Sequence, residues 1–129
     1  MGKEERKLKK NNSYAKGRTA EQSRLDYVRK NNEAVIGQRF RGSKVSIAWI
    51  RLLGVNPKVD LWYLDRFGVL HFENFKYRGK NQPKAYITKD ELLQLKQFAN
   101  LFRNYSHIAV CYVLKNYRQK VIVVRLNKA

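Results

Sequence analysis

Hydrophobic positions repeat with a helical period in two segments of the chain. Leu25 and Val28 share one face of the first segment, which starts at residue 19 and reaches about residue 30. The second segment carries a longer apolar stripe at three- and four-residue spacings: Leu92, Leu95, Phe98, Ala99 and Phe102. Each segment opens with a threonine followed three residues later by Gln22 or Glu91, the pattern of a capping box. The spacing therefore predicts two helices, the second ending near Arg103.

Five other apolar runs have the length and composition of β-strands. They cover residues 33–40, 59–64, 69–77, 108–114 and 121–126. Asp65 to Gly68 separates the second run from the third and predicts a hairpin turn, and residues 115–120 predict a turn between the last two. Residues 41–58 fit a strand or a helix equally well, because short apolar runs do not distinguish the two.

The order of these elements predicts an α/β fold in which helices flank a mixed central β-sheet. Residues 19–129 are enough for one domain with its own core. Residues 1–18 are polar and basic, and only Leu8 and Tyr14 could add to a core. We expect a flexible N-terminal tail that orders when it lies against phosphates.

The net charge narrows the choice of partner. The chain has 28 Lys and Arg against 10 Asp and Glu, a formal charge of +18. Such an imbalance makes the folded chain repel itself, and a polyanion relieves that repulsion. Nucleic acid is the expected partner, because contacts with phosphate also release condensed counterions.

Membrane and zinc functions fit the sequence poorly. No apolar run approaches the ~18 residues of a spanning helix, no broadly apolar basic helix suits a membrane surface, and the N-terminus lacks the apolar region of a signal peptide. One cysteine, Cys111, and two histidines cannot form a structural zinc site. We expect a cytoplasmic protein in which Cys111 is buried, and in which His71 and His107 have structural roles with no visible partner.

Basic residues cluster in the tail, after the first predicted strand and in the loop before the second helix. The expected nucleic-acid contacts are Lys7, Lys9, Lys10, Lys16, Arg18, Arg39, Arg41, Lys44, Arg78, Lys80 and Lys84. Tyr77 and Tyr86 flank this loop and are candidates for stacking on bases. The turn at residues 115–120 is also basic and could touch phosphate. For each position, a solvated surface charge is the alternative interpretation.

Four residues could form a catalytic group: Glu21, Asp60, Asn74 and Lys76. Asn74 and Lys76 lie two apart on one strand and therefore point to the same face. Hairpin pairing brings that strand beside Asp60. Glu21, in the first turn of the first helix, could approach the same place.

These residues stand in an order that resembles the archaeal Holliday junction resolvases, members of the PD-(D/E)xK nuclease superfamily. The family opens with Lys-Gly-Ser-x-x-Glu, and this chain has Lys16-Gly17-Arg18-Thr19-Ala20-Glu21. An Asp at a strand start corresponds to Asp60, and the Glu-x-Lys of the next strand to Asn74-Phe75-Lys76. A basic linker, Ala85-Tyr86-Ile87-Thr88 and an amphipathic helix follow, so the match runs from about residue 16 to 126.

The resemblance implies a restriction-endonuclease-like fold and a Mg²⁺-dependent endonuclease. Glu21, Asp60, Asn74 and Lys76 would then be the catalytic residues, with Asp60 and Asn74 as metal ligands. A four-way junction offers two symmetric cut sites, so such an enzyme would act as a homodimer.

The main departure is that the family's metal-binding Glu falls on Asn74. Glu73 is adjacent, but strand alternation points it to the opposite face, and only a bulge would bring it to the metal. The loss of one negative charge weakens binding of a divalent ion by several kcal/mol at low dielectric, before screening and relaxation. We therefore expect weak Mg²⁺ binding and slow or absent cleavage. Without a metal, Lys76 can pair with Asp60.

Two classes of function stay open on the sequence. The first is a structure-specific endonuclease acting on branched DNA as a homodimer. The second is a non-catalytic protein with the same fold, either an architectural DNA-binding protein or an RNA-binding, ribosome-associated one. The latter would bind structured RNA as a monomer within a particle. The sequence does not distinguish DNA from RNA.

Overall fold

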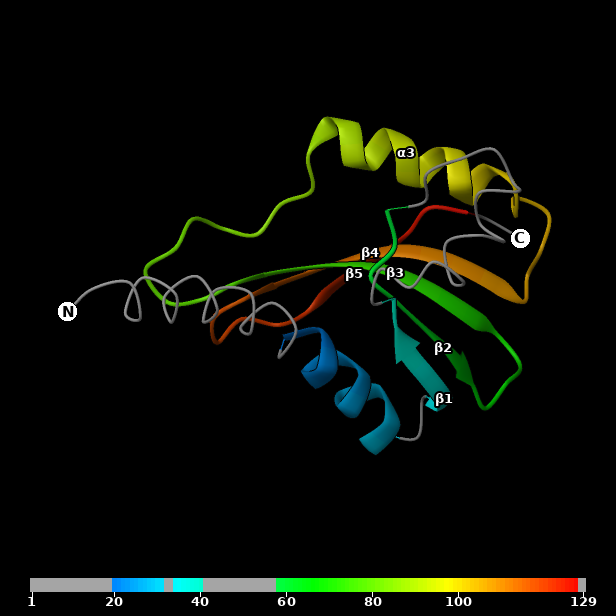
Figure 1. Cartoon of the computed structure of the whole chain (residues 1–129), viewed down its shortest axis with the longest axis horizontal. Coiled ribbons are helices and arrows are strands. Elements are labelled where there is room, and N and C mark those ends of the chain that lie inside the picture. Colours follow the sequence, from blue (N-terminus) through cyan, green and yellow to red (C-terminus); the bar gives the residue numbers. More distant parts are fainter. Residues whose placement is uncertain (1–19, 32–33, 41–57, 128–129) are drawn as a thin grey trace, which may run out of the picture.

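The fold is an α/β domain with a mixed five-stranded sheet (Figure 1). The computed structural model describes residues 20–31, 34–40 and 58–127. The strands are β1 (Ala34–Arg39), β2 (Leu61–Asp65), β3 (Leu70–Arg78), β4 (Ile108–Asn116) and β5 (Ile122–Arg125), and they lie in that order across the sheet. β3 and β4 are parallel, whereas the other neighbouring pairs are antiparallel. The predicted mixed sheet is confirmed, and the tail and residues 41–57 of the ambiguous segment 41–58 lie outside the described residues.

The first helix, residues 20–30, packs on one face of the sheet. Leu25 and Val28 are buried against Leu61 and Tyr63 of β2. β1 can approach β2 closely because Gly37 has no side chain. A Cβ at this position would lie 2.8 Å from the Cβ of Tyr63 and 2.9 Å from the backbone oxygen of Trp62. This first predicted helix and its apolar face are confirmed.

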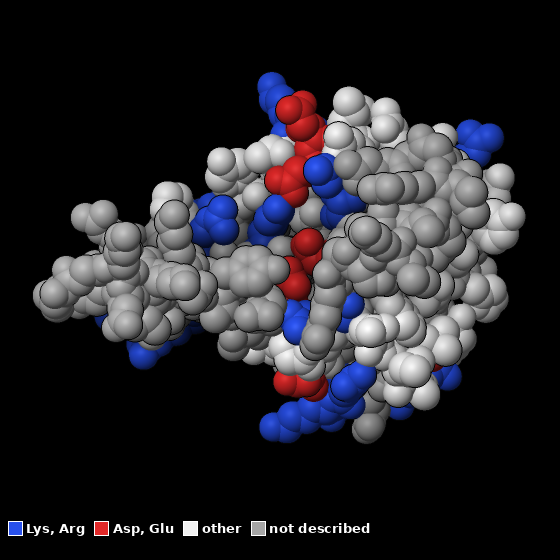
Figure 2. Space-filling view, viewed as in Figure 1, with Lys and Arg blue, Asp and Glu red and all other residues white. Residues whose placement is uncertain are grey.

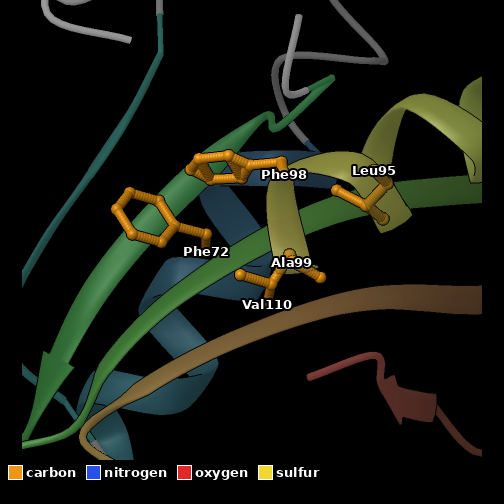
Figure 3. Close-up of a cluster of buried hydrophobic side chains, with 5 residues drawn as sticks. All are labelled: Phe72, Leu95, Phe98, Ala99 and Val110. Atoms are coloured by element: carbon orange, nitrogen blue, oxygen red, sulfur yellow. The ribbon is translucent and has the colours of Figure 1, made fainter. Parts of the chain in front are cut away.

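The second helix, α3 (Lys89–Asn100), covers the other face of the sheet. Its side chains Leu95, Phe98 and Ala99 are buried against Phe72 of β3 and Val110 of β4 (Figure 3). The rings of Phe72 and Phe98 meet edge to face with centroids 5.3 Å apart, a favourable aromatic geometry. Burial of these large apolar groups is the main force that holds α3 on the sheet.

The ends of α3 show how local hydrogen bonding sets its length. The hydroxyl of Thr88 accepts a hydrogen bond from the Glu91 backbone N–H at 3.2 Å, as the capping box predicts. The helix ends at Asn100, before the predicted end at Arg103. The backbone N–H groups of Leu101 and Phe102 donate to carbonyls three residues back, so the chain tightens into turns there.

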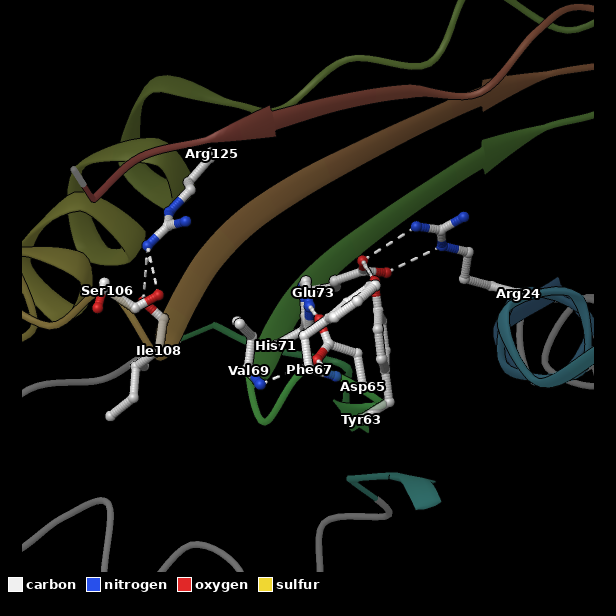
Figure 4. A network of polar contacts seen from close by, with 10 residues as sticks. All are labelled: Arg24, Tyr63, Asp65, Phe67, Val69, His71, Glu73, Ser106, Ile108 and Arg125. Carbon is white, nitrogen blue, oxygen red and sulfur yellow. Dashed lines mark hydrogen bonds and ion pairs between the residues drawn. The ribbon is translucent and has the colours of Figure 1, made fainter. Parts of the chain in front are cut away.

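The β2–β3 hairpin is fixed by Asp65 (Figure 4). One carboxylate oxygen accepts the backbone N–H groups of Phe67 and Val69 at 2.8 and 2.9 Å, and the other contacts the His71 ring at 2.8 Å. Partial burial raises the pKa of Asp65, but the His71 contact and the two backbone donors outweigh it and lower that pKa. The expectation that His71 lacks a partner was therefore wrong, because pairing across the turn brings it to Asp65.

The C-terminal strand is held by Asn127, which is 2% exposed. Its amide nitrogen donates to the carbonyls of Phe102 and Ile108 at 2.9 and 2.6 Å, and its oxygen accepts the Val110 N–H at 2.8 Å. Arg125 of β5 adds hydrogen bonds to carbonyls of the loop before β4 (Figure 4). These contacts satisfy buried backbone groups that would otherwise destabilise the fold.

Candidate functional site

The candidate site lies at the start of β2, where β3 extends beyond its last residue paired with β2. Leu61 is opposite Glu73 in the antiparallel register, and the Asp60 backbone N–H still donates to the Glu73 carbonyl at 2.8 Å. The Asp60 side chain then accepts the Phe75 backbone N–H at 2.7 Å. The carboxylate of Asp60 therefore takes the position where a further backbone carbonyl of β2 would have paired with β3.

Asn74 occupies the position beside Asp60 and is almost fully buried, at 2% exposed. Its amide nitrogen donates to the Lys58 carbonyl at 2.6 Å and faces a Glu91 oxygen at 3.4 Å. Its amide oxygen is buried and has no hydrogen-bond partner among the described residues. A buried amide oxygen without a donor is costly, and such an atom is a natural contact for a cation or a water molecule.

Lys76 completes this face of β3 and forms an ion pair with Glu91 of α3, at 2.5 Å. Both side chains are about one-quarter exposed. Partial burial raises the pKa of Glu91, but the hydrogen bond and charge of Lys76, with further bonds from Asn74 and Thr88, lower it overall. We expected that Lys76 could pair with Asp60; its ion pair is with Glu91 instead, although its charge also lowers the pKa of Asp60.

Glu21 approaches the same place from the first helix. Desolvation by burial and the charge of Asp60 raise the pKa of Glu21 to about 7, while Arg39 and Lys76 act against that increase. Desolvation also raises the pKa of Asp60, although the Phe75 N–H and Lys76 counteract it. The charges of Glu21, Asp60 and Lys76 thus act on one another, and Asn74 and Lys76 both contact Glu91.

Glu73 lies on the opposite face of β3 and belongs to a separate network (Figure 4). It is 0% exposed, and Arg24 of the first helix donates to both of its carboxylate oxygens at 3.0 Å. The Tyr63 hydroxyl adds a bond of 3.1 Å. Pairing with β4 runs in unbroken register from Leu70 to Arg78, so β3 contains no bulge that would turn Glu73 toward Asp60.

The residues that could hold a cation are Asp60, Asn74 and Glu91. Within the described ranges, no three His, Cys, Asp or Glu side chains gather as a metal site. Asn74 contacts Glu91, and the charge of Glu91 acts on Asp60, so these three residues offer hard oxygen atoms of the kind that suits Mg²⁺. Because Lys76 already neutralises part of this charge, the set fits a weakly held cation. The sequence did not indicate Glu91 as a site residue, because its place in the capping box of α3 already accounted for an acidic residue there.

Basic side chains surround this acidic centre. Figure 2 shows acidic groups near the middle of one face of the molecule, with Lys and Arg side chains beside them. Of the expected nucleic-acid contacts, the structure places Arg39 near Glu21, and Arg78, Lys80 and Lys84 at the end of β3 and in the loop after it. The remaining positions lie outside the described residues: Lys7, Lys9, Lys10, Lys16, Arg18, Arg41 and Lys44.

Cys111 is a potentially reactive side chain outside the candidate site. Cys111 is buried in β4, and desolvation with the nearby Glu73 charge raises the pKa of its thiol to about 12. A thiol of that kind is a poor nucleophile, as its predicted structural role requires. Neither helix in the described part of the chain has the length and apolar character needed to cross a membrane.

Comparison with known proteins identifies no relative of this chain. No protein-family model, curated protein or solved structure matches this chain.

Proposed function

We propose that this protein binds nucleic acid through a nuclease-type fold whose catalytic site has lost most of its cation affinity. One observation carries the proposal. The Asp60 carboxylate accepts the N–H of Phe75, which lies between Asn74 and Lys76 on β3, and the charges of Asp60 and Lys76 act on Glu21; this grouping supports the resolvase resemblance. The order of the described elements is a helix, three antiparallel strands, a helix, a strand parallel to β3 and a final antiparallel strand, and this order is compatible with a restriction-endonuclease-like fold.

Charge supports nucleic acid as the partner. A formal charge of +18 on 129 residues is far above what solubility requires. Phosphates would neutralise it with release of counterions, and this gives affinity with little sequence preference. Branched DNA bound by a homodimer is the form that the resemblance favours.

The composition of the site supports weak catalysis. Mg²⁺ held by Asp60, Asn74 and Glu91 would lower the pKa of a bound water, which is the chemistry that phosphodiester hydrolysis needs. In this chain, Asn74 contributes a neutral oxygen, Lys76 is paired with Glu91, and Glu21 is partly protonated near neutral pH. Each feature lowers the negative charge available to a divalent ion.

The same features favour a second candidate, a non-catalytic binder of structured RNA that acts as a monomer within a particle. The Lys76–Glu91 ion pair gives the site a stable arrangement in the absence of any metal. A protein that only binds phosphates has no need of a cation there. The two candidates share the fold and differ in the nucleic acid and in the use of the site.

Cleavage of a labelled four-way DNA junction in Mg²⁺ and in Mn²⁺ tests the proposal. The wild type should bind the junction and cut it slowly or not at all, and Asp60→Asn should abolish any cutting while preserving binding. Asp90→Asn is the matched control, because Asp90 is an exposed acid next to Glu91. Rapid cutting that needs Asp60 would refute the weakened site. Absence of binding to the junction, a duplex and a structured RNA would refute the proposal altogether.

A further inference from the structure

Three exposed tyrosines lie at the same end of the sheet. Tyr77 is next to the last residue of β3, Tyr86 lies in the loop before α3, and Tyr117 lies in the turn between β4 and β5. Their exposed fractions are 36%, 61% and 38%. We call these three residues the tyrosine cluster. More than a third of each side chain is therefore open to solvent, and the three together form an exposed aromatic group at one end of the sheet.

Backbone hydrogen bonds hold the two loops together. The Tyr117 N–H donates to the Arg78 carbonyl at 2.9 Å, and the Ala85 N–H donates to the Asn116 side chain at 2.6 Å. In the parallel register of β3 and β4, Tyr77 is opposite Lys115. Each tyrosine is therefore attached to a fixed part of the sheet end, and the cluster is organised before any ligand binds.

The two segments that carry the cluster are basic and contain no acidic residue. Residues 77–88 and 115–120 contain no Asp or Glu. They contain six basic residues: Arg78, Lys80, Lys84, Lys115, Arg118 and Lys120. Within the described part of the chain, no carboxylate forms an ion pair with any of the six. The Arg118 guanidinium lies over the Tyr117 ring, 5.1 Å from its centroid.

We propose that the tyrosine cluster binds unpaired nucleotides, with the rings stacking on bases and the six cations contacting the phosphates. This inference rests on the proposed nucleic-acid function and names the form of nucleic acid that this end of the molecule recognises. Exposed rings can stack only on bases that are free of a duplex, and every base offers a suitable face. The cluster therefore distinguishes single-stranded from paired segments, in DNA or in RNA, without reading sequence.

Binding of labelled oligonucleotides to the full chain tests this inference. The probes are single strands of about 20 nucleotides, one DNA and one RNA, and the duplex DNA of the same length. The double variant Tyr86→Leu/Tyr117→Leu should weaken binding of at least one single strand by about 10-fold or more, because stacking contributes ~10-fold or more per base. Its binding to the duplex should change less than about 2-fold.

Tyr27→Leu is the matched control, because Tyr27 is 55% exposed on the first helix, outside the two loops. It should leave all three affinities unchanged, and circular dichroism confirms that each variant is folded. If the wild type binds the probes but the double variant loses nothing, or loses equally on the duplex, the tyrosine cluster is not a base-stacking site. If the wild type binds none of the probes at low salt, the proposed nucleic-acid function itself is wrong.

Discussion

Replacing Arg24 with methionine should strongly destabilise the fold. Arg24 donates to both oxygens of Glu73 at 3.0 Å, and the two side chains are 7% and 0% exposed. The variant leaves a buried carboxylate whose remaining donor among the contacts described here is the Tyr63 hydroxyl, at 3.1 Å. Burial and the adjacent carboxylate raise the pKa of Tyr63, so its hydroxyl stays protonated and cannot replace a positive charge.

The magnitude follows from this geometry. Removal of one partner of a buried ion pair costs about 3–5 kcal/mol, because the other charge stays desolvated. We therefore expect the free energy of unfolding to fall by that amount in Arg24→Met. The double variant Arg24→Met/Glu73→Gln removes the charge and keeps an acceptor for Tyr63. It should recover at least half of the loss.

Urea denaturation followed by circular dichroism measures both variants, with the denaturant slope as a check that the unfolded state is unchanged. A loss below ~1 kcal/mol in Arg24→Met would be typical of an exposed pair and would refute the buried pairing. A double variant as unstable as the single one would refute the cause, an uncompensated charge. The pair also holds the helix that carries Glu21 against β3, so it positions one side of the candidate site.

Other predictions concern pH, buried hydrogen bonds and the cation site. Because the pKa of Glu21 is raised in the folded state from its ordinary 4.5 to about 7, the free energy of unfolding should fall as pH rises from about 4.5 to 7. Glu21→Gln should remove that pH dependence and stabilise the protein at pH 8 by about 1–2 kcal/mol after screening; equal slopes in urea melts of both proteins would contradict this. Asn127→Ala should lower the free energy of unfolding by about 1–3 kcal/mol, since the buried Val110 N–H loses its acceptor, while the Phe102 and Ile108 carbonyls keep the Tyr105 N–H and the Arg125 guanidinium as donors; a loss below ~0.5 kcal/mol in the same melts would contradict this. Asn74→Asp should tighten Mn²⁺ binding about 10-fold or more in a calorimetric titration, because it adds one charge beside the ion; an unchanged affinity would exclude Asn74 from the cation site.

The sequence predicted those features that depend on local geometry. Strand alternation separated Asn74 from Glu73 correctly, and the capping box located the start of α3 at Thr88. The hairpin turn at Asp65 to Gly68 put β3 beside Asp60, because short turns fix the register of antiparallel strands.

Features that depend on packing between distant segments were not predictable. Glu91 reaches Lys76 only because the crossover through α3 packs that helix on the sheet. Arg24 and Glu73 are 49 residues apart, and no local signal connects them. Asn127 likewise satisfies carbonyls from the end of α3 and the start of β4, which only the folded chain brings together.

The salt dependence of junction binding tests the central claim most directly. Anisotropy of a labelled four-way DNA junction, and of a structured RNA of similar size, should be followed from about 50 to 200 mM salt. A chain with a net charge of +18 that binds phosphates should show a steep linear fall of the logarithm of affinity with the logarithm of salt concentration, for one probe at least. Weak binding at low salt, or affinity that does not change with salt, would contradict the claim that this basic surface binds nucleic acid.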